Sequence, residues 1–214
     1  MSRGLGDVYK RQMQQKIIIL DFGSQTTQLI GRRVRELDTF CEILPYNKFP
    51  KDDPSVIGVI LSGSPYSVHD PEAFKVDLTQ FVGKIPVLGI CYGFQAMAYA
   101  LGADVDKAAL GEYGKTDTTI DKTDGLLAGS PAEQDTWMSH GVAVKTAPAG
   151  FEVLAHTEGA PVAAMQDESR KLYGVQWHPE VKHTPLGQKL IETFLHQCAG
   201  LPDNWDASSI IEDQ

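Results

Sequence analysis

One cysteine stands where a nucleophile would be expected. Cys91 has small neighbours in the segment Gly89-Ile90-Cys91-Tyr92-Gly93, which follows an apolar run and precedes a helix-like stretch. A sharp turn from a strand into a helix crowds its neighbours, so glycines on both sides of a nucleophile are typical of such a turn. The positive end of the following helix favours a thiolate. Since cysteine is also among the most buried residue types, Cys91 alone fits a structural core residue equally well.

Partners for this cysteine lie near the other end of the chain. His178-Pro179-Glu180 follows a strand-like segment. Proline favours an extended conformation for the residue before it, and side chains two positions apart in an extended segment point the same way. Glu180 can therefore bind one imidazole nitrogen and leave the other for Cys91. We predict that Cys91, His178 and Glu180 are the catalytic residues of an acyl transfer reaction.

Acyl transfer also requires hydrogen-bond donors for the oxyanion. The amide of Tyr92 follows the nucleophile directly and is one candidate. Gly63 and Ser64 are the others, because they lie in a turn after an apolar strand; a plain surface turn is the alternative interpretation. Gln95 comes about one helical turn after Cys91 and is expected near the site, unless it is simply a solvated helix residue.

The order of elements predicts the α/β class, with a doubly wound, mostly parallel sheet flanked by helices. The predicted strands are residues 16–20, 41–44, 57–61 and 86–90, and the predicted helices are residues 26–37, 71–82 and 94–101. Strands that alternate with helices form right-handed β-α-β units. In such sheets the site lies at the carboxyl ends of the strands, which brings together the turns at residues 21–25 and 62–65 and Cys91.

A different pattern follows residue 101. Turn-rich, alternating segments at residues 114–120, 135–138, 151–157, 161–166 and 172–177 predict an added antiparallel or mixed sheet in the same domain. Residues 184–197 predict a closing helix. We expect one domain over residues 13–199, with Met13 as the natural start, an unstructured extension or sequence-assembly scar at residues 1–12, and a linker or docking tail at residues 200–214.

Composition narrows the functional classes. The net charge of −9 argues against a general nucleic-acid binder. Three cysteines without a C-x-x-C pair suit a reducing cytoplasm, and no segment is long and apolar enough to cross a membrane. No metal site is expected, because the histidines are scattered. His69 and His156 are expected to be surface or structural residues, and His183 to shape the rim of the site.

Taken together, these motifs resemble a known family. Residues 86–95 and 176–180 are similar to class I glutamine amidotransferases, and residues 19–25, 59–63, 137–141 and 178–184 resemble the amidotransferase part of the GMP synthases. The resemblance covers roughly residues 16–198. It implies hydrolysis of L-glutamine, in which Cys91 forms a γ-glutamyl thioester and ammonia leaves. It also implies that Gln95 and the backbone of Ser139 and His140 bind the glutamine, and that this domain needs no cofactor.

The resemblance further implies a partner. In GMP synthases, an ATP-pyrophosphatase (synthetase) domain or subunit uses ATP and Mg²⁺ and takes the ammonia to aminate xanthosine monophosphate to GMP. The Ser-Gly-Gly-x-Asp-Ser loop of that domain does not occur in this sequence. We therefore expect either a fragment of a two-domain synthetase or a separate glutaminase subunit. The tail with Trp205 resembles the start of the interdomain connection, which favours a fragment.

Three positions depart from the family pattern. Ser64 replaces a glycine before a proline, which would cost about 1 kcal/mol or more if the position needed positive φ. Val142 replaces an aspartate, and Gly111 replaces an arginine. The alternatives are a glutaminase subunit of another amidotransferase, a γ-glutamyl hydrolase or related cysteine peptidase, and a non-catalytic docking subunit.

Overall fold

One nine-stranded sheet forms the centre of the molecule. The computed structural model describes residues 15–75 and 77–198, so the predicted extension at residues 1–12 and the tail at residues 200–214 lie outside the described residues. The strand order is β2-β1-β3-β4-β9-β8-β7-β5-β6. The strands are β1 (Lys16–Asp21), β2 (Phe40–Pro45), β3 (Val56–Leu61), β4 (Val87–Ile90), β5 (Val105–Ile120), β6 (Glu133–Val144), β7 (Glu152–His156), β8 (Ala164–Asp167) and β9 (Leu172–Val175).

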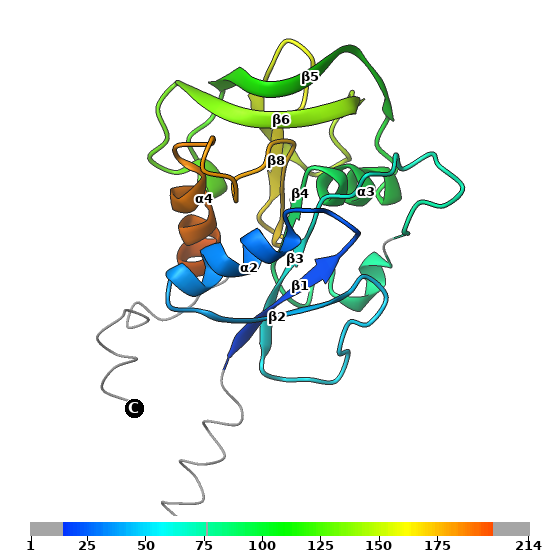
Figure 1. Cartoon of the computed structure of the whole chain (residues 1–214), viewed down its shortest axis with the longest axis vertical. Coiled ribbons are helices and arrows are strands. Elements are labelled where there is room, and N and C mark those ends of the chain that lie inside the picture. Colours follow the sequence, from blue (N-terminus) through cyan, green and yellow to red (C-terminus); the bar gives the residue numbers. More distant parts are fainter. Residues whose placement is uncertain (1–14, 76, 199–214) are drawn as a thin grey trace, which may run out of the picture.

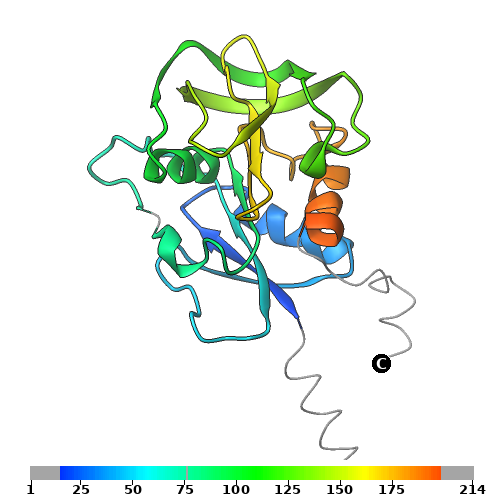
Figure 2. The same ribbon diagram turned by 180° about the vertical axis from the view of Figure 1, so that it is seen from behind.

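The half of the sheet that contains β2, β1, β3, β4 and β9 is parallel. Its strands are continuous apolar runs because helices cover both faces. Ile17 and Ile19 pack on one side with α2 (Thr27–Glu36) and α4 (Gly187–Thr193). Leu20 packs on the other side with α3 (Tyr92–Ala100). Figures 1 and 2 show these two layers of helices from opposite sides of the molecule. The predicted doubly wound arrangement is confirmed.

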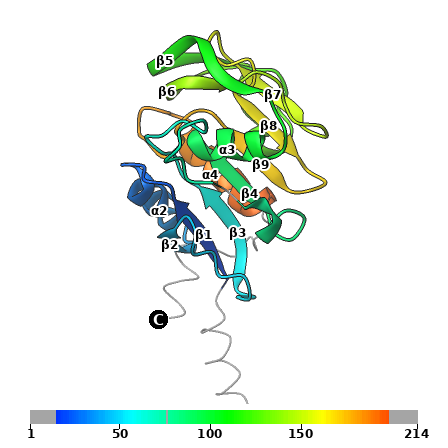
Figure 3. The ribbon, with the colours of Figure 1, turned by 90° about the vertical axis from the view of Figure 1, so that its right-hand side faces the viewer.

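The other half, from β9 through β8, β7 and β5 to β6, is antiparallel. Hydrogen bonds between β8 and β9 join it to the parallel half, so the predicted added sheet is a continuation of the first sheet. The long β5–β6 pair lies above the parallel strands in Figures 1 and 3. It therefore covers the carboxyl ends of β1, β3 and β4, where a site was expected.

The predicted helix at residues 71–82 is wrong. The described residues of this segment contain only a short 3₁₀ turn, η1 (Leu78–Gln80), capped by the side chain of Asp77. In a helix the carbonyl of Phe74 would accept from the amide of Leu78. Instead it accepts from the hydroxyl of Tyr92 at 2.6 Å, while the Phe74 ring stacks on Tyr46. Tertiary contacts thus override the helical pattern.

The closing helix is shorter than predicted. The carbonyl of Thr184 accepts from the amide of Gly187 in a turn, and α4 begins only at Gly187. The chain then continues into a π turn, η3 (Phe194–Cys198). A second 3₁₀ turn, η2 (Gly125–Leu127), precedes β6. Within residues 15–75 and 77–198, no helix is long and apolar enough to span a membrane.

Candidate active site

The sharp turn predicted around Cys91 is present between β4 and α3. Cys91 has φ of 53° and ψ of −107°, a conformation that costs a non-glycine residue roughly 1–3 kcal/mol. Its amide donates to the carbonyl of Val175 at 2.9 Å, and its carbonyl accepts the first helical bond from Gln95 at 3.0 Å. A Cβ at Gly93 would collide with the carbonyl of Leu61, and one at Gly89 would lie 2.8 Å from the backbone nitrogen of Phe94. Close packing on both sides explains the two glycines.

His178 is held in one orientation from several directions. Its Nδ1 lies 2.7 Å from Oε1 of Glu180, whose side chain is fully buried. Its amide donates to the carbonyl of Trp137, and its carbonyl accepts from the hydroxyl of Thr184 at 2.8 Å. The carboxylate of Glu180 only accepts, so Nδ1 carries the hydrogen and Nε2 is left for Cys91.

The charges of this group reinforce one another. Burial lowers the pKa of His178, but the negative charge of a Cys91 thiolate and the hydrogen bond to it, followed by the contributions of Glu180, outweigh burial and raise the pKa from 6.5 to about 11. Such a shift is what a thiolate–imidazolium pair produces. The imidazole of His178 therefore stays protonated at neutral pH.

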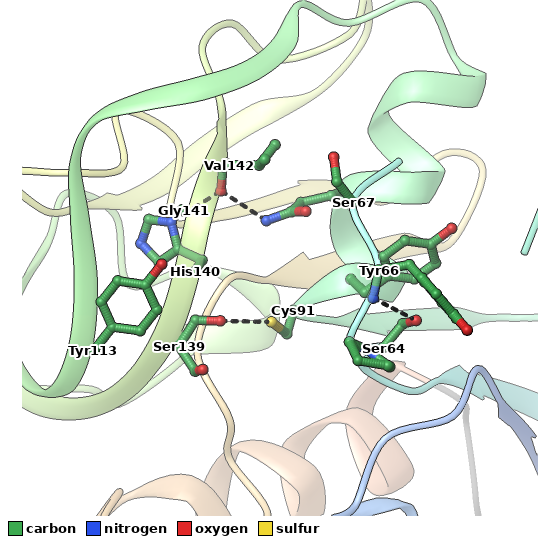
Figure 4. A pocket seen from close by; sticks show the side chains of 12 residues that line it. Ser64, Tyr66, Ser67, Cys91, Tyr113, Ser139, His140, Gly141 and Val142 are labelled. Carbon is green, nitrogen blue, oxygen red and sulfur yellow. Dashed lines mark hydrogen bonds between the residues drawn. The ribbon is translucent and has the colours of Figure 1, made fainter. Parts of the chain in front are cut away.

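Two further groups contact the sulfur of Cys91. The carbonyl of Ser139 lies 3.7 Å from Sγ and can accept from a thiol, a contact drawn in Figure 4. The side-chain amide nitrogen of Gln176 also lies 3.7 Å from Sγ, as a donor. Gln95 links β6 to the segment after β9. Its Nε2 donates to the carbonyl of Val142 at 2.8 Å and to Oε1 of Gln176 at 3.1 Å.

A cavity of about 270 Å³ opens beside Cys91 (Figure 4). All three predicted glutamine contacts, Gln95, Ser139 and His140, line it. The ring of His140 is buried and has no nitrogen to spare, because Nε2 lies 2.7 Å from Oε1 of Glu112 and Nδ1 lies 2.9 Å from the carbonyl of Val142. The backbone of His140 is thus the part that can serve a ligand.

Two of the three predicted oxyanion donors, Tyr92 and Ser64, also line the cavity. The amide of Tyr92 is in the first turn of α3, where amides have no acceptor within the helix. Neither Gly63 nor Ser64 is among the described residues with positive φ, so the strain considered for Ser64 does not arise. Burial raises the pKa of the Tyr92 hydroxyl to about 12, so it remains a donor to Phe74.

The turns after β1 and β3 meet near His178. A Cβ built on Gly63 would lie 3.4 Å from Cε1 of His178 and 3.5 Å from Oγ of Ser24. Gly63 itself does not line the cavity, although Ser64 next to it does. The expected convergence of loops at the carboxyl ends of the parallel strands is therefore observed.

The structure shows where two residues that depart from the family pattern, Val142 and Gly111, lie. Val142 uses its backbone carbonyl to accept from Gln95 and His140, which any residue at this position can do. Gly111 is exposed.

His69 and His156 are exposed and bind the carbonyl of Val105 and the carboxylate of Asp121, respectively.

The ring contact of His183 is with Trp137 and not with Cys91, His178 or Glu180. Its ring stacks on Trp137 in β6, with centroids 4.6 Å apart. The backbone carbonyl of Trp137 accepts from the amide of His178. Across residues 15–75 and 77–198, no three His, Cys, Asp or Glu side chains are grouped so that they could hold a metal ion.

Sequence reasoning missed three residues around the site: Glu112, Gln176 and Thr184. Gln176 is two positions before His178, and this spacing could have placed it on the same side of an extended segment. Glu112 carried no such signal, because its partners are distant in the sequence, and Thr184 binds both the nearby carbonyl of His178 and the distant amide of Trp137. The carboxyl group of Glu112 accepts from Thr157 and Gly159 and contacts Nε2 of His140, so three polar groups surround it.

Comparison with known proteins agrees with this geometry. The family model for class-I glutamine amidotransferases matches residues 18–198. The chain belongs to this family. The chain is 68% identical over 203 residues to a glutamine-hydrolysing GMP synthase of Bifidobacterium longum, covering 92% of this chain and 37% of that protein. For the GMP synthase of Phocaeicola vulgatus the identity is 53% over 201 residues, with 94% and 39% covered. This class-I amidotransferase chain thus spans about two fifths of the length of these relatives.

Solved structures extend the comparison. A protein from Thermoplasma acidophilum, described as one subunit of a GMP synthase, superposes with a TM-score of 0.77 at 29% identity, covering 94% of this chain and 98% of that one. A glutamine amidotransferase from Thermotoga maritima gives a TM-score of 0.70 at 16% identity, with 87% and 99% covered, which is a likeness of fold alone. The predicted family and fold class are confirmed.

Proposed function

We propose that this class-I amidotransferase chain hydrolyses L-glutamine to glutamate and ammonia, with Cys91 as nucleophile, His178 as general acid and base, and Glu180 as the residue that orients His178. The observation that supports this most is the arrangement of the three residues: Cys91 lies in the strained turn between β4 and α3 beside the cavity, and Nδ1 of His178 lies 2.7 Å from Oε1 of the buried Glu180. A nucleophile, a base and an orienting carboxylate beside a cavity are the parts that acyl transfer requires.

In the first half-reaction, Sγ of Cys91 attacks the side-chain amide carbon of glutamine. The electron pair of the carbonyl moves to oxygen, and the amide of Tyr92 with the turn at Gly63 and Ser64 donates to this oxyanion. When the oxyanion collapses, the carbon–nitrogen bond breaks and Nε2 of His178 gives its proton to the leaving nitrogen. The products are free ammonia, a γ-glutamyl thioester on Cys91 and a neutral imidazole.

In the second half-reaction, the neutral imidazole of His178 takes a proton from water while the water oxygen attacks the thioester carbon. The carbon–sulfur bond then breaks, glutamate leaves, and the thiolate and imidazolium are restored. Glu180 keeps the hydrogen on Nδ1 throughout, so Nε2 alone exchanges protons.

The ammonia is proposed to go to an ATP-pyrophosphatase (synthetase) domain or subunit, which aminates xanthosine monophosphate to GMP. The identity to proteins named GMP synthase, of which this chain spans about two fifths, supports this assignment. ATP and Mg²⁺ would bind to that partner. Because free ammonia becomes ammonium in water, productive transfer requires the partner to be docked.

The test measures glutamate release from glutamine and from γ-glutamyl peptides, with this chain alone and with the synthetase domain of the Bifidobacterium longum relative loaded with ATP, Mg²⁺ and xanthosine monophosphate. We expect glutamine to be the preferred substrate and GMP to form only when both parts are present. Preference for the peptides would instead identify a γ-glutamyl hydrolase.

Labelling by a diazoketone analogue of glutamine separates the remaining alternatives. We expect selective modification of Cys91 and loss of labelling in Cys91→Ala. Cys41 is a matched control, because it is also a buried free thiol but lies in β2. A chain that neither turns over glutamine with its partner nor labels at Cys91 would be a docking subunit.

A further inference from the structure

Gln176 occupies a position that the proposed mechanism does not yet use. It is fully buried directly after β9 and two residues before His178. Its amide nitrogen lies 3.7 Å from Sγ of Cys91, and its amide oxygen accepts from Gln95 at 3.1 Å. We propose that Gln176 is a further residue of the active site, which keeps an N–H donor on the Cys91 sulfur and turns Gln95 so that only its oxygen serves the ligand. This inference rests on the proposed function.

The direction of these hydrogen bonds follows from one fixed group. The carbonyl of Val142 is backbone and can only accept, so the atom of Gln95 that lies 2.8 Å from it must be the amide nitrogen. The second hydrogen of that nitrogen points to Gln176, which must therefore present its oxygen. The nitrogen of Gln176 is then the atom that faces Cys91. Reversing either amide would place two acceptors, or two donors, against each other.

The carbonyl of Val142 is itself held in place. His140 donates to it from Nδ1 at 2.9 Å, and Nε2 of the same ring binds the buried carboxylate of Glu112 at 2.7 Å. The orientation of the Gln176 amide beside the sulfur is thus set by a chain of contacts that starts at Glu112 in β5 and ends at Gln176, directly after β9. The two amide side chains in it are almost completely buried, with Gln95 exposed by 4% and Gln176 by 0%. In such surroundings an unpaired donor or acceptor is costly, so the polarity is stable.

For Cys91 this arrangement distinguishes the two protonation states. A thiol can donate to the carbonyl of Ser139, but a thiolate is repelled by that oxygen. The N–H of Gln176 is the opposite case, because a donor binds a thiolate more strongly than a thiol. Gln176 therefore stabilises the nucleophilic form together with the imidazolium of His178.

The orientation of Gln95 also determines which ligand groups can bind beside it: groups that donate a hydrogen bond are preferred. Both hydrogens of the Gln95 side chain are used, by Val142 and by Gln176. The oxygen is the only polar group that Gln95 can then offer to the cavity it lines. It accepts from a ligand nitrogen that bears hydrogen and disfavours a carboxylate at the same place.

Two substitutions separate these roles. Gln176→Met keeps the length of the side chain and removes both hydrogen-bonding groups. Gln176→Glu keeps an acceptor for Gln95 but puts a carboxylate oxygen in place of the N–H beside the sulfur. The first readout is the rate of alkylation of Cys91 by iodoacetamide as a function of pH, which needs no turnover. The second is kcat and KM for glutamine in the presence of the synthetase partner.

We expect Gln176→Met to alkylate about tenfold more slowly at pH 7, with a profile moved to higher pH, because a hydrogen bond to the charged sulfur is lost. Gln176→Glu should alkylate more slowly still. KM for glutamine should rise about tenfold in Gln176→Met, where Gln95 loses its partner, but stay near the wild-type value in Gln176→Glu. Wild-type alkylation and KM in both variants would overturn the inference.

Gln166→Met is the matched control. Gln166 is a buried glutamine of the adjacent strand β8, exposed by 2%, and its Oε1 accepts from the amide of Leu126 at 3.1 Å. This variant should lose stability but keep the wild-type alkylation profile and KM. If it reproduced the changes of Gln176→Met, general loosening of the core would explain them and the inference would fall.

Failure of the proposed function and failure of this inference give different results. If the wild-type chain alkylates selectively at Cys91 but never hydrolyses glutamine, the proposed function is wrong, while the comparison of alkylation profiles still decides the role of Gln176. If Gln176→Met does not fold, as judged by its unfolding midpoint, Gln176→Glu carries the test, because faster alkylation than wild type would contradict a donor at this position.

Discussion

Nδ1 of His178 lies 2.7 Å from Oε1 of Glu180, and only Pro179 separates the two residues in the chain. This pair is therefore a local product of the sequence. The approach of His178 to Cys91 is not local, since it depends on the parallel pairing of β4 with β9, in which Ile90 is opposite Val175. A slip by one residue would turn the following side chains to the other face of the sheet. The register of these two strands thus sets the geometry of the site.

Replacing Glu180 by glutamine tests the local pair. The amide oxygen of Glu180→Gln can still accept from Nδ1, but the negative charge that helps to hold the proton on His178 is lost. We expect glutaminase kcat to fall roughly 100-fold or more, with a small change in KM. Steady-state kinetics with the partner present measures this, and an unchanged kcat would remove Glu180 from the mechanism.

The charge state of His178 gives a prediction on pH. Its pKa in the folded protein, about 11, is above the ordinary value of 6.5. A raised pKa means that the stabilisation is fully present below pH 6.5 and is lost as the pH rises towards 11. The free energy of unfolding should therefore decrease with pH in this window.

Cys91→Ala is the control for this pH dependence, because the thiolate is the largest of the causes that raise the pKa of His178. We expect the Cε1 proton resonance of His178 to titrate at lower pH in the variant than in the wild type. The variant should also lose much of the slope of stability against pH. Identical titrations in the two proteins would show that sulfur and ring do not interact.

Gly93, two residues after Cys91, is expected to be intolerant of any side chain. A Cβ at Gly93 would collide with the carbonyl of Leu61, which is backbone and cannot move aside. We expect Gly93→Ala to lower the free energy of unfolding by about 3 kcal/mol, measured by urea denaturation. Gly111→Ala is the control, because its nearest contact is the exposed ring of Tyr113, which can move.

The buried pair of Glu112 and His140 is expected to hold β6, the strand proposed to bind glutamine. Glu112→Gln removes a buried carboxyl group that contacts His140, Thr157 and Gly159, and an amide cannot satisfy all three, so we expect a loss of about 3 kcal/mol in stability and a higher KM for glutamine. Asp121→Asn is the matched control: its carboxylate also lies 2.7 Å from a histidine, His156, but both side chains are exposed. Less than about 1 kcal/mol is expected there, with no change in KM.

Activity is expected to depend on the partner. We expect this chain alone to turn over glutamine slowly, and to be stimulated when the synthetase partner carries ATP and xanthosine monophosphate. The reason for this expectation is that the acceptor-loaded partner orders the glutaminase site, so that ammonia is released when an acceptor is docked. Glutamate release with and without the loaded partner measures this, and rapid steady turnover by the isolated chain would refute it.

Local chemistry in the sequence was enough to predict residues that the structure places together beside Cys91, while their catalytic roles stay a prediction. The glycines around Cys91, the His178-Pro179-Glu180 segment and the apolar runs of β1, β3 and β4 depend on sterics between near neighbours and on burial, which short patterns express directly. The class of fold followed, because alternating strands and helices have few ways to pack. The prediction at residues 71–82 failed, since the contacts of Phe74 and Tyr92 join segments that the pattern cannot relate.

Contacts between distant segments were decided only by the tertiary structure. The amide of Gln176 reaches Cys91 across 85 positions of sequence, and Glu112 meets His140 across 28, in both cases because of strand pairing in the sheet. The partner of such a buried hydrogen bond is not readable from the sequence, because it is chosen by the register of strands and not by the neighbours in the chain.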